Sequence, residues 1–96
     1  MKTIAMKIVS GEELIGRFVA ESPLPHGGIG VTMTHARVIG LQQDASGNYG
    51  VGLMDYVIAH KDGAITIGRD KIITSYEPDH AIEKAFLSQT SGLQLA

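Results

Sequence analysis

Two adjacent glutamates, Glu12 and Glu13, are the first carboxylates of the chain and could in type do acid–base chemistry. They lie in the stretch SGEELIG, residues 10–16, where Ser10 and Gly11 favour a tight turn. Catalysis by two carboxylates requires both to face one site. Neighbouring residues on a strand point to opposite faces instead. The stretch therefore predicts a hairpin turn followed by a strand, and not a catalytic pair.

Four histidines, His26, His35, His60 and His80, could ligate a metal ion. Their spacings match no compact ligand motif, and the chain contains no cysteine to assist them. The sequence also lacks a Gly-x-Ser-x-Gly elbow, a phosphate loop and a dinucleotide fingerprint. We therefore expect no metal site, no cofactor, no small-molecule substrate and no enzymatic activity.

The remaining candidates are basic side chains in loops. Arg69 and Lys71 lie in the turn GRDK at 68–71, and His26 lies in the loop SPLPHGG at 22–28. Such side chains can meet phosphates or stack on the bases of a single-stranded nucleic acid. In the alternative interpretation, Arg69 and Lys71 only keep an exposed turn hydrated, and His26 caps a loop. The sequence leaves both interpretations open.

The charge balance limits how large a nucleic-acid surface can be. Eight Lys and Arg residues stand against ten Asp and Glu residues, which gives a net charge of -2 and argues against an extensive phosphate-binding surface. Aromatic residues make up 5% of the chain, which argues against a large base-stacking platform. Arg17 and Arg37 are isolated within predicted strands, and we expect both on an exposed face. The composition therefore leaves a local basic rim as the kind of nucleic-acid surface that this chain could form.

The chain of 96 residues is long enough for one domain with a modest core, so we predict a single domain over residues 1–96. Its first residues, MKTIAMKIVSGEE, place two lysines within an apolar stretch, unlike a secretory signal. No apolar run reaches membrane-spanning length. We therefore expect a soluble, cytoplasmic protein that does not contact a membrane.

Alternating apolar residues dominate the first part of the chain, as half-buried strands require. In the third predicted strand the alternation changes parity near His35, which indicates a bulge or a sharp bend. Turns rich in glycine, proline, asparagine and aspartate separate the strands. The expected strands are 2–9, 13–21, 29–43, 49–60 (resumed by 64–67 after a bend at 61–63) and 72–76.

A short helix is predicted to follow the last strand. Pro78 stands where the first turn of a helix tolerates proline. From about 79 to 90 the apolar residues, among them Ile82, Ala85 and Phe86, fall mainly at helical spacing, and Gly92 could cap the helix. About five antiparallel strands and one terminal helix favour a small, strongly bent sheet or barrel.

The stretch MKIVSGEELIGRFVAE resembles the first half of the Sm fold signature, with Gly11 in the turn and Gly16 permitting a bend in the second strand. AITIGRDKIITSY is similar to the second half, where a short turn with glycine and a basic residue joins the last two strands. With YEPDHAIEKAFLSQTSG, the chain resembles in particular the Sm-like proteins of marine cyanobacterial viruses. The resemblance implies a mainly β fold, a five-stranded antiparallel Sm-like (SH3-like) barrel with a C-terminal α-helix.

Sm-like proteins work as rings, in which the last strand of one subunit pairs with the fourth strand of its neighbour. The resemblance therefore implies a homo-oligomer, with about five to seven subunits. The predicted strands at 49–60 and 72–76 agree with this independently, because they lack the inward lysines or prolines that would blunt an open edge. The alternative is a monomeric barrel whose edges pair within the chain.

In Sm-like rings, single-stranded RNA is held by the loop after the second strand and the loop before the fifth. The resemblance places His26 in the first loop and Arg69 and Lys71 in the second. Two departures put uridine specificity in doubt: the Asp-x-x-Asn pattern of the first loop is missing, and the Arg-Gly pair of the second appears reversed, as Gly68 and Arg69.

Two functions follow from these expectations. In the first, the chain is a non-catalytic Sm-like ring that binds single-stranded RNA and takes part in RNA handling or regulation, in the cytoplasm of a virus-infected host cell. In the second, the ring is a structural or protein-assembly module that binds no nucleic acid. The resemblance favours the first function, whereas the charge balance and the missing pocket residues favour the second.

Overall fold

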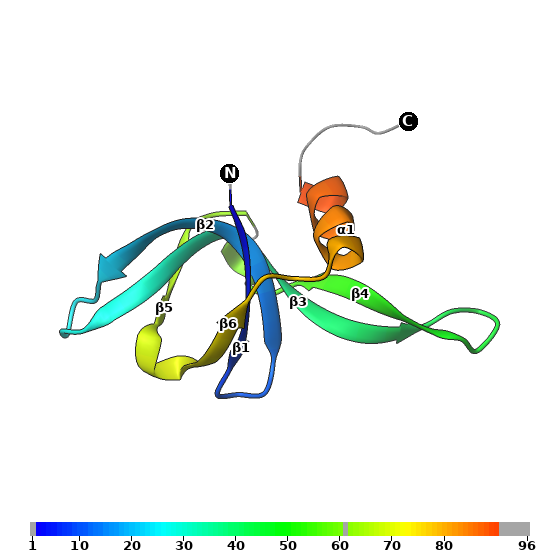
Figure 1. Ribbon diagram of the computed structural model, residues 1–96, viewed down its shortest axis with the longest axis horizontal. Helices are drawn as coiled ribbons and strands as arrows, with labels where there is room; N and C mark the ends of the chain where they lie inside the picture. Colours follow the sequence, from blue (N-terminus) through cyan, green and yellow to red (C-terminus); the bar gives the residue numbers. More distant parts are fainter. Residues whose placement is uncertain (1, 61, 91–96) are drawn as a thin grey trace.

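The computed structural model describes residues 2–60 and 62–90 of the chain. Within these residues it contains six β-strands, two short 3₁₀ helices and one α-helix (Figure 1). The helix confirms the prediction for 79–90, and Gly92 lies outside the described residues. In chain order the elements are β1 (Thr3–Ile8), β2 (Glu13–Pro23), β3 (Ile29–Gln43), β4 (Tyr49–Asp55), η1 (Ile58–His60), β5 (Ile65–Gly68), η2 (Arg69–Lys71), β6 (Ile72–Tyr76) and α1 (His80–Thr90).

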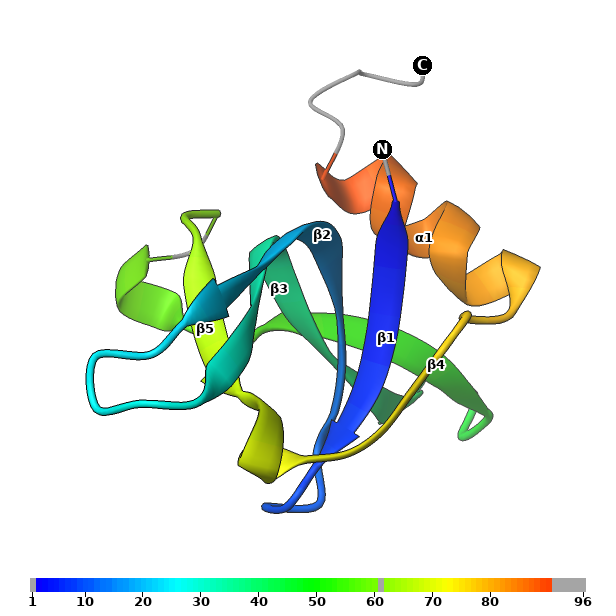
Figure 2. The same ribbon diagram turned by 60° about the vertical axis from the view of Figure 1, so that its left-hand side comes forward.

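The strands form one antiparallel sheet in the order β4-β3-β2-β1-β6, and β5 pairs separately with β3. The mainly β fold with a C-terminal helix is thus confirmed. The sheet curls strongly, as the predicted bent sheet requires, but it is not closed, so the alternative of a barrel whose edges pair within the chain is wrong (Figure 2). Among the described residues, β6 pairs with β1 and not with β4 or β5 at the other side of the sheet, which leaves the gap.

The expectation of five strands, with 49–60 as one of them, is also wrong. β4 ends at Asp55, and Ile58–His60 turns as a 3₁₀ helix before β5 begins at Ile65. The physical reason lies in the partner strand: β4 pairs with residues 37–43 of β3, and β5 with residues 30–33. Because β3 bends between these halves, one continuous strand could not follow both.

The bend of β3 is centred on His35, as the change of parity predicted. His35 has a φ of 58°, in the left-handed region that L-residues rarely adopt. Ile15 pairs with Arg37 but Arg17 pairs with Thr34, so β3 contains one more residue than β2 at this point. Opposite the bend, a methyl group on Gly16 would lie 2.7 Å from the Sδ of Met33 and 3.2 Å from the carbonyl oxygen of Thr34, so glycine suits the close approach of the two strands.

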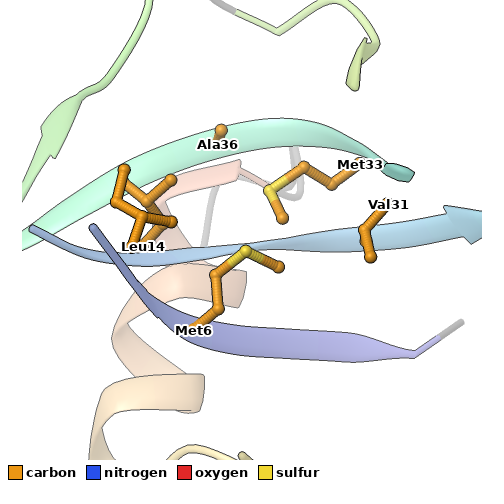
Figure 3. Packing of buried hydrophobic residues seen from close by; sticks show 6 residues of the cluster. Met6, Leu14, Val31, Met33 and Ala36 are labelled. Carbon is orange, nitrogen blue, oxygen red and sulfur yellow. The ribbon is translucent and has the colours of Figure 1, made fainter. Parts of the chain in front are cut away.

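The concave side of the curled sheet holds the larger core. Met6, Leu14 and Met33 are fully buried there, and Val31 and Ala36 are nearly so (Figure 3). These side chains come from β1, β2 and β3, the strands that the turn at residues 9–12 and the bend bring together. Gly11 in that turn has a φ of 96°, which confirms the predicted hairpin.

The convex side of the sheet is covered by α1. Phe86 is fully buried against Ala5 and Ile15, and Ile82 packs beside it. Burying a phenylalanine and its contact surface stabilises a fold by about 2–3 kcal/mol. The helix therefore forms a second, smaller core and fixes the convex face of the sheet.

β4 and β6 form the two ends of the strand order and are open edges of the sheet, and β5, which pairs with β3, has an open edge as well. β4 pairs only with β3, and β6 pairs only with β1, among the residues that the structure describes. Beyond α1, β3 and β4 project as a hairpin arm, seen at the right of Figure 1. Both edges carry exposed apolar side chains, namely Tyr49, Val51 and Met54 on β4 and Ile73 and Tyr76 on β6.

Candidate nucleic-acid interface

His26 lies in the loop that joins β2 to β3. The loop is closed by two backbone hydrogen bonds, from the amide of Leu24 to the carbonyl of Gly28 at 3.0 Å and from the amide of Gly27 to the carbonyl of Leu24 at 3.1 Å. Gly27 and Gly28 have φ values of 95° and 83°, which explains why glycines stand there. The His26 side chain is exposed, so it is available to a partner.

Arg69 and Lys71 lie on η2, the turn that joins β5 to β6. Their side chains are 62% and 64% exposed. The chain turns over Arg69–Lys71, between extended residues at Gly68 and Ile72, and the amide of Ile72 donates a hydrogen bond to the carbonyl of Arg69. Both cations are thus presented to solvent at one end of the sheet.

The structure brings the two loops to the same end of the sheet. Gly30, at the start of β3, pairs with Gly68, at the end of β5. A methyl group on Gly68 would lie 3.5 Å from Cδ1 of Leu24, a residue of the His26 loop. His26, Arg69 and Lys71 therefore belong to neighbouring loops.

Positive and negative charges are close to balanced at the end of the sheet where the two loops lie. Arg69 donates a hydrogen bond from Nη2 to Oε1 of Glu21, on β2. The Lys71 Nζ lies 3.8 Å from Oδ2 of Asp70, whose side chain is 75% exposed. An anionic ligand must therefore compete with two surface carboxylates for Arg69 and Lys71. Exposed ion pairs of this kind stabilise a fold by less than about 1 kcal/mol, so they can be exchanged for a pair with the ligand.

A hollow of about 370 Å³ is lined by Arg69 together with residues of β1, β2, β3 and β6. Its lining includes the apolar residues Ile4, Phe18 and Val31 and the cation of Lys2. Residues of β6, among them Ile73, also line it. This hollow follows the open edge of β6.

Arg37 contradicts the expectation of an exposed strand charge. Its side chain is only 2% exposed. The guanidinium donates to Oδ1 of Asp62 at 2.8 Å and to Oε1 of Gln89 at 3.0 Å, and its Nε lies 3.3 Å from Oδ1 of Asp55. The extra residue at the bend turns Arg37 to the convex face, where α1 covers it. The residue therefore ties β3, β4 and α1 together.

Arg17 is also partly covered, contrary to the expectation. Its Nη2 donates a 3.0 Å hydrogen bond to the carbonyl of Thr90, in the last turn of α1. A cation at this end of a helix interacts favourably with the helix dipole. Sequence reasoning missed both arginines as anchors for the helix. The available signal was Asp55, which lies directly across from Arg37 in the hairpin of β3 and β4.

The other polar candidates are separated in the structure. Within residues 2–60 and 62–90, no three His, Asp or Glu side chains gather in a group that could hold a metal ion. Glu12 accepts a 2.8 Å hydrogen bond from the Ser10 hydroxyl, and Glu13 stands next to it at the start of β2. His35 bonds to Thr34 through its Nδ1 at 3.0 Å.

No protein-family model matches the chain, and a search of curated proteins finds no significant match. No helix in the described part of the chain is both long enough and apolar enough to cross a membrane. No relative therefore indicates which residues of the candidate interface bind a ligand, and the support for it comes from its geometry.

Proposed function

We propose that the chain is a non-catalytic Sm-like protein that assembles into a homo-oligomeric ring and binds single-stranded RNA. One observation carries the proposal: β4 and β6 stand at opposite edges of one curled sheet, and both edges expose apolar side chains. The resemblance of the sequence to Sm-like proteins of marine cyanobacterial viruses supports the same conclusion. The site of action is then the cytoplasm of a virus-infected host cell.

The two edges are suited to each other. Each presents a row of backbone donors and acceptors, and unpaired edges of this kind recruit another strand. Contact between unlike edges of identical subunits is head-to-tail, and it generates a closed ring when the rotation between subunits completes a circle. Val51 on β4 is 53% exposed and Ile73 on β6 is 60% exposed, so the same contact would bury apolar surface.

The RNA part of the proposal rests on the neighbouring loops. His26 is exposed on one and Arg69 and Lys71 on the other. Repetition of these loops around a ring would join small basic sites into one continuous rim, so that a phosphate backbone meets many of them at once. A chain with a net charge of -2 could bind RNA in this way.

A second function, assembly without nucleic acid, is favoured by one specific observation. Arg69 is already paired with Glu21, and Lys71 lies near Asp70. If these pairs persist in the ring, the rim has little net positive charge. Measurements of mass and of RNA affinity separate the two functions.

Mass in solution tests the assembly. Light scattering at micromolar concentration should report about five to seven times the chain mass of 10.2 kDa. A lone particle of 10.2 kDa would overturn the ring and the shared rim together. Substitution of Ile73 by Lys on the exposed edge should then lower the measured mass without unfolding the chain, because Ile73 is 60% exposed.

Binding to short oligouridine and oligoadenine RNA across a salt series tests the RNA function. Affinity should fall as salt rises, and Arg69→Ala with Lys71→Ala should make the slope shallower by about one for each phosphate that the variant no longer neutralises. Lys84→Ala, which removes an exposed charge from α1, is the matched control and should leave the slope unchanged. A ring that binds neither RNA at low salt has the assembly function instead.

A further inference from the structure

Ile58 has the largest exposed fraction of any large apolar side chain in the described residues, at 86%. It belongs to η1, the turn between β4 and β5. A single exposed apolar side chain is common on protein surfaces and is not by itself a binding site. Ile58 differs from such a residue because the segment that carries it is anchored on both sides and a hollow of suitable character lies on another edge of the sheet.

Two contacts anchor this segment to the body of the protein. Before η1, Tyr56 packs against the larger core, and its amide donates a 3.4 Å hydrogen bond to the carbonyl of Ala36. After η1, Asp62 accepts a 2.8 Å hydrogen bond from the buried Arg37. Because both ends are held, a partner that buries Ile58 has to order little additional chain.

The hollow of about 370 Å³ beside Arg69 is an apolar receptor for such a side chain. Its lining includes Val31 of the larger core, together with Ile4 and Phe18, which pack against that core. Among the described residues, none of η1 lines the hollow of its own subunit. Figure 2 shows η1 (green, at the left) on the far side of β5 from β6 (yellow). Ile58 is therefore positioned for the hollow of a second copy and not for its own.

The strand pairing of the proposed ring brings the two features together. The strand pairs of the sheet are antiparallel. If β4 of one copy continues this pattern with β6 of the next, Asp55 at the end of β4 lies beside Ile72 at the start of β6. Ile58 follows three residues after Asp55, so it lies next to the hollow that Ile72 and Arg69 line.

The charges around the two features are complementary. Lys2 and Arg69 line the hollow. Asp55 and Asp62 flank η1, and their side chains stay 35% and 51% exposed although both pair with Arg37. Opposite charges on two approaching surfaces favour one orientation and disfavour others, which supports a defined contact between copies.

We propose that Ile58 of one copy inserts into the hollow beside Arg69 of the next copy and fixes the register of β4 against β6. The inference rests on the ring of the proposed function and names the contact that locks one subunit to its neighbour. Backbone pairing alone lets two edges slip by two residues, whereas a side chain in a hollow selects one register. The contact also links assembly to the loop that carries Arg69, because Arg69 lines the hollow that Ile58 fills.

Mass measurements over a dilution series test the contact. Ile58→Ala should raise the concentration at which half of the assembly dissociates by about tenfold or more, because the variant loses most of the side chain that the hollow buries. Ile58→Leu keeps the apolar volume and should lie closer to the wild type than the alanine variant does. Val19→Ala is the matched control: it truncates a 55% exposed side chain on β2, a strand paired on both sides, and should leave dissociation unchanged.

Pairs of introduced cysteines locate the contact, since the native chain contains no cysteine. Under mild oxidation, Ile58→Cys with Thr74→Cys, which lies in the lining of the hollow, should give a ladder of covalently linked chains on a denaturing gel. Ile58→Cys with Tyr76→Cys is the contrasting pair and should give no ladder. A ladder from this second pair would mean that β6 pairs with the open edge of β5, because η1 precedes β5 and would then meet the end of β6. That result overturns the proposal.

The outcomes separate this contact from the ring itself. A wild-type particle of a single chain would overturn both. A wild type that assembles, but whose dissociation is insensitive to Ile58→Ala or which gives no ladder from the cysteines at 58 and 74, would overturn the contact and leave the ring in place.

Discussion

Arg37 and Arg69 are the same type of residue in opposite surroundings. Arg37 is 2% exposed, and its guanidinium is shared among two carboxylates and an amide from three parts of the fold. Arg69 is 62% exposed and bonds to one carboxylate of a neighbouring strand. The first region is the Arg37 cluster, defined by Arg37, Asp55, Asp62 and Gln89, and the second is the loop rim of His26, Arg69 and Lys71.

The difference in burial gives the two arginines different roles: Arg37 holds the fold together, whereas Arg69 can exchange its partner for a ligand. Removal of one partner from a buried charge network leaves the others without compensation, which is strongly destabilising. An exposed pair stabilises the fold by less than about 1 kcal/mol and can be exchanged for a pair with a ligand. The Arg37 cluster is therefore suited to holding α1, and the loop rim is suited to meeting an anion.

The largest effect is expected from Arg37→Ala. It leaves Asp55 and Asp62 without the Arg37 cation and removes the anchor of Gln89. Both carboxylates reach solvent, at 35% and 51% exposure, so we expect a loss near the lower end of the range for buried pairs, about 3 kcal/mol of unfolding free energy. Urea unfolding followed by circular dichroism measures it.

Two variants sharpen this result. Arg37→Lys keeps the charge but loses the planar fork, so its unfolding free energy should lie between those of the wild type and the alanine variant. Arg69→Ala should change the unfolding free energy by less than about 0.5 kcal/mol. Equal losses for Arg37→Ala and Arg69→Ala would remove the distinction between the two regions.

A smaller effect is expected from Glu21→Gln, which takes the carboxylate away from Arg69. If RNA meets the loop rim, one competing negative charge per subunit is removed, and affinity for oligouridine should rise about threefold or more at low salt. Glu83→Gln on α1 removes the same charge elsewhere and serves as the control. Weaker RNA binding by Glu21→Gln would contradict a role of Arg69 as a phosphate contact.

Local features of the fold could be predicted from the sequence because they depend on local chemistry. The turn at Gly11 needs a positive φ, the bend at His35 disturbs an alternating pattern, and the helix follows from the spacing around Phe86. The positions of the candidate loops followed from the same reasoning, because glycine and proline mark them plainly.

Features that depend on distant partners could not be predicted in this way. The burial of Arg37 requires Asp62 and Gln89, which are 25 and 52 residues away in the chain. The sequence indicated a bend at 61–63, but the earlier end of β4 at Asp55 follows from the curvature of β3, whose two halves pair with β4 and β5. The Glu21–Arg69 pair spans 48 residues and sets the charge of the rim. Each needs the register of the sheet, which no local pattern contains.

The smallest effect concerns His35, which stands beside the Arg37 cluster. Burial lowers its pKa from the ordinary value of 6.5, Arg17 and Arg37 lower it further, and Asp62 opposes them. Because the unfolded chain then binds the proton more tightly, the stability from neutral His35 is complete above pH 6.5. It is lost as the pH falls from 6.5 through the lower folded-state pKa.

Urea unfolding at several pH values between about 5 and 7.5 should show this slope, and His35→Asn should remove it. Asparagine is the suitable replacement because it tolerates the φ of 58° better than most residues, so the bend of β3 is kept. The slope should persist in His26→Asn, the control that removes the exposed loop histidine. A slope of opposite sign would mean that the carboxylate of Asp62 outweighs burial and both arginines, and the Arg37 cluster would then be a net acidic environment.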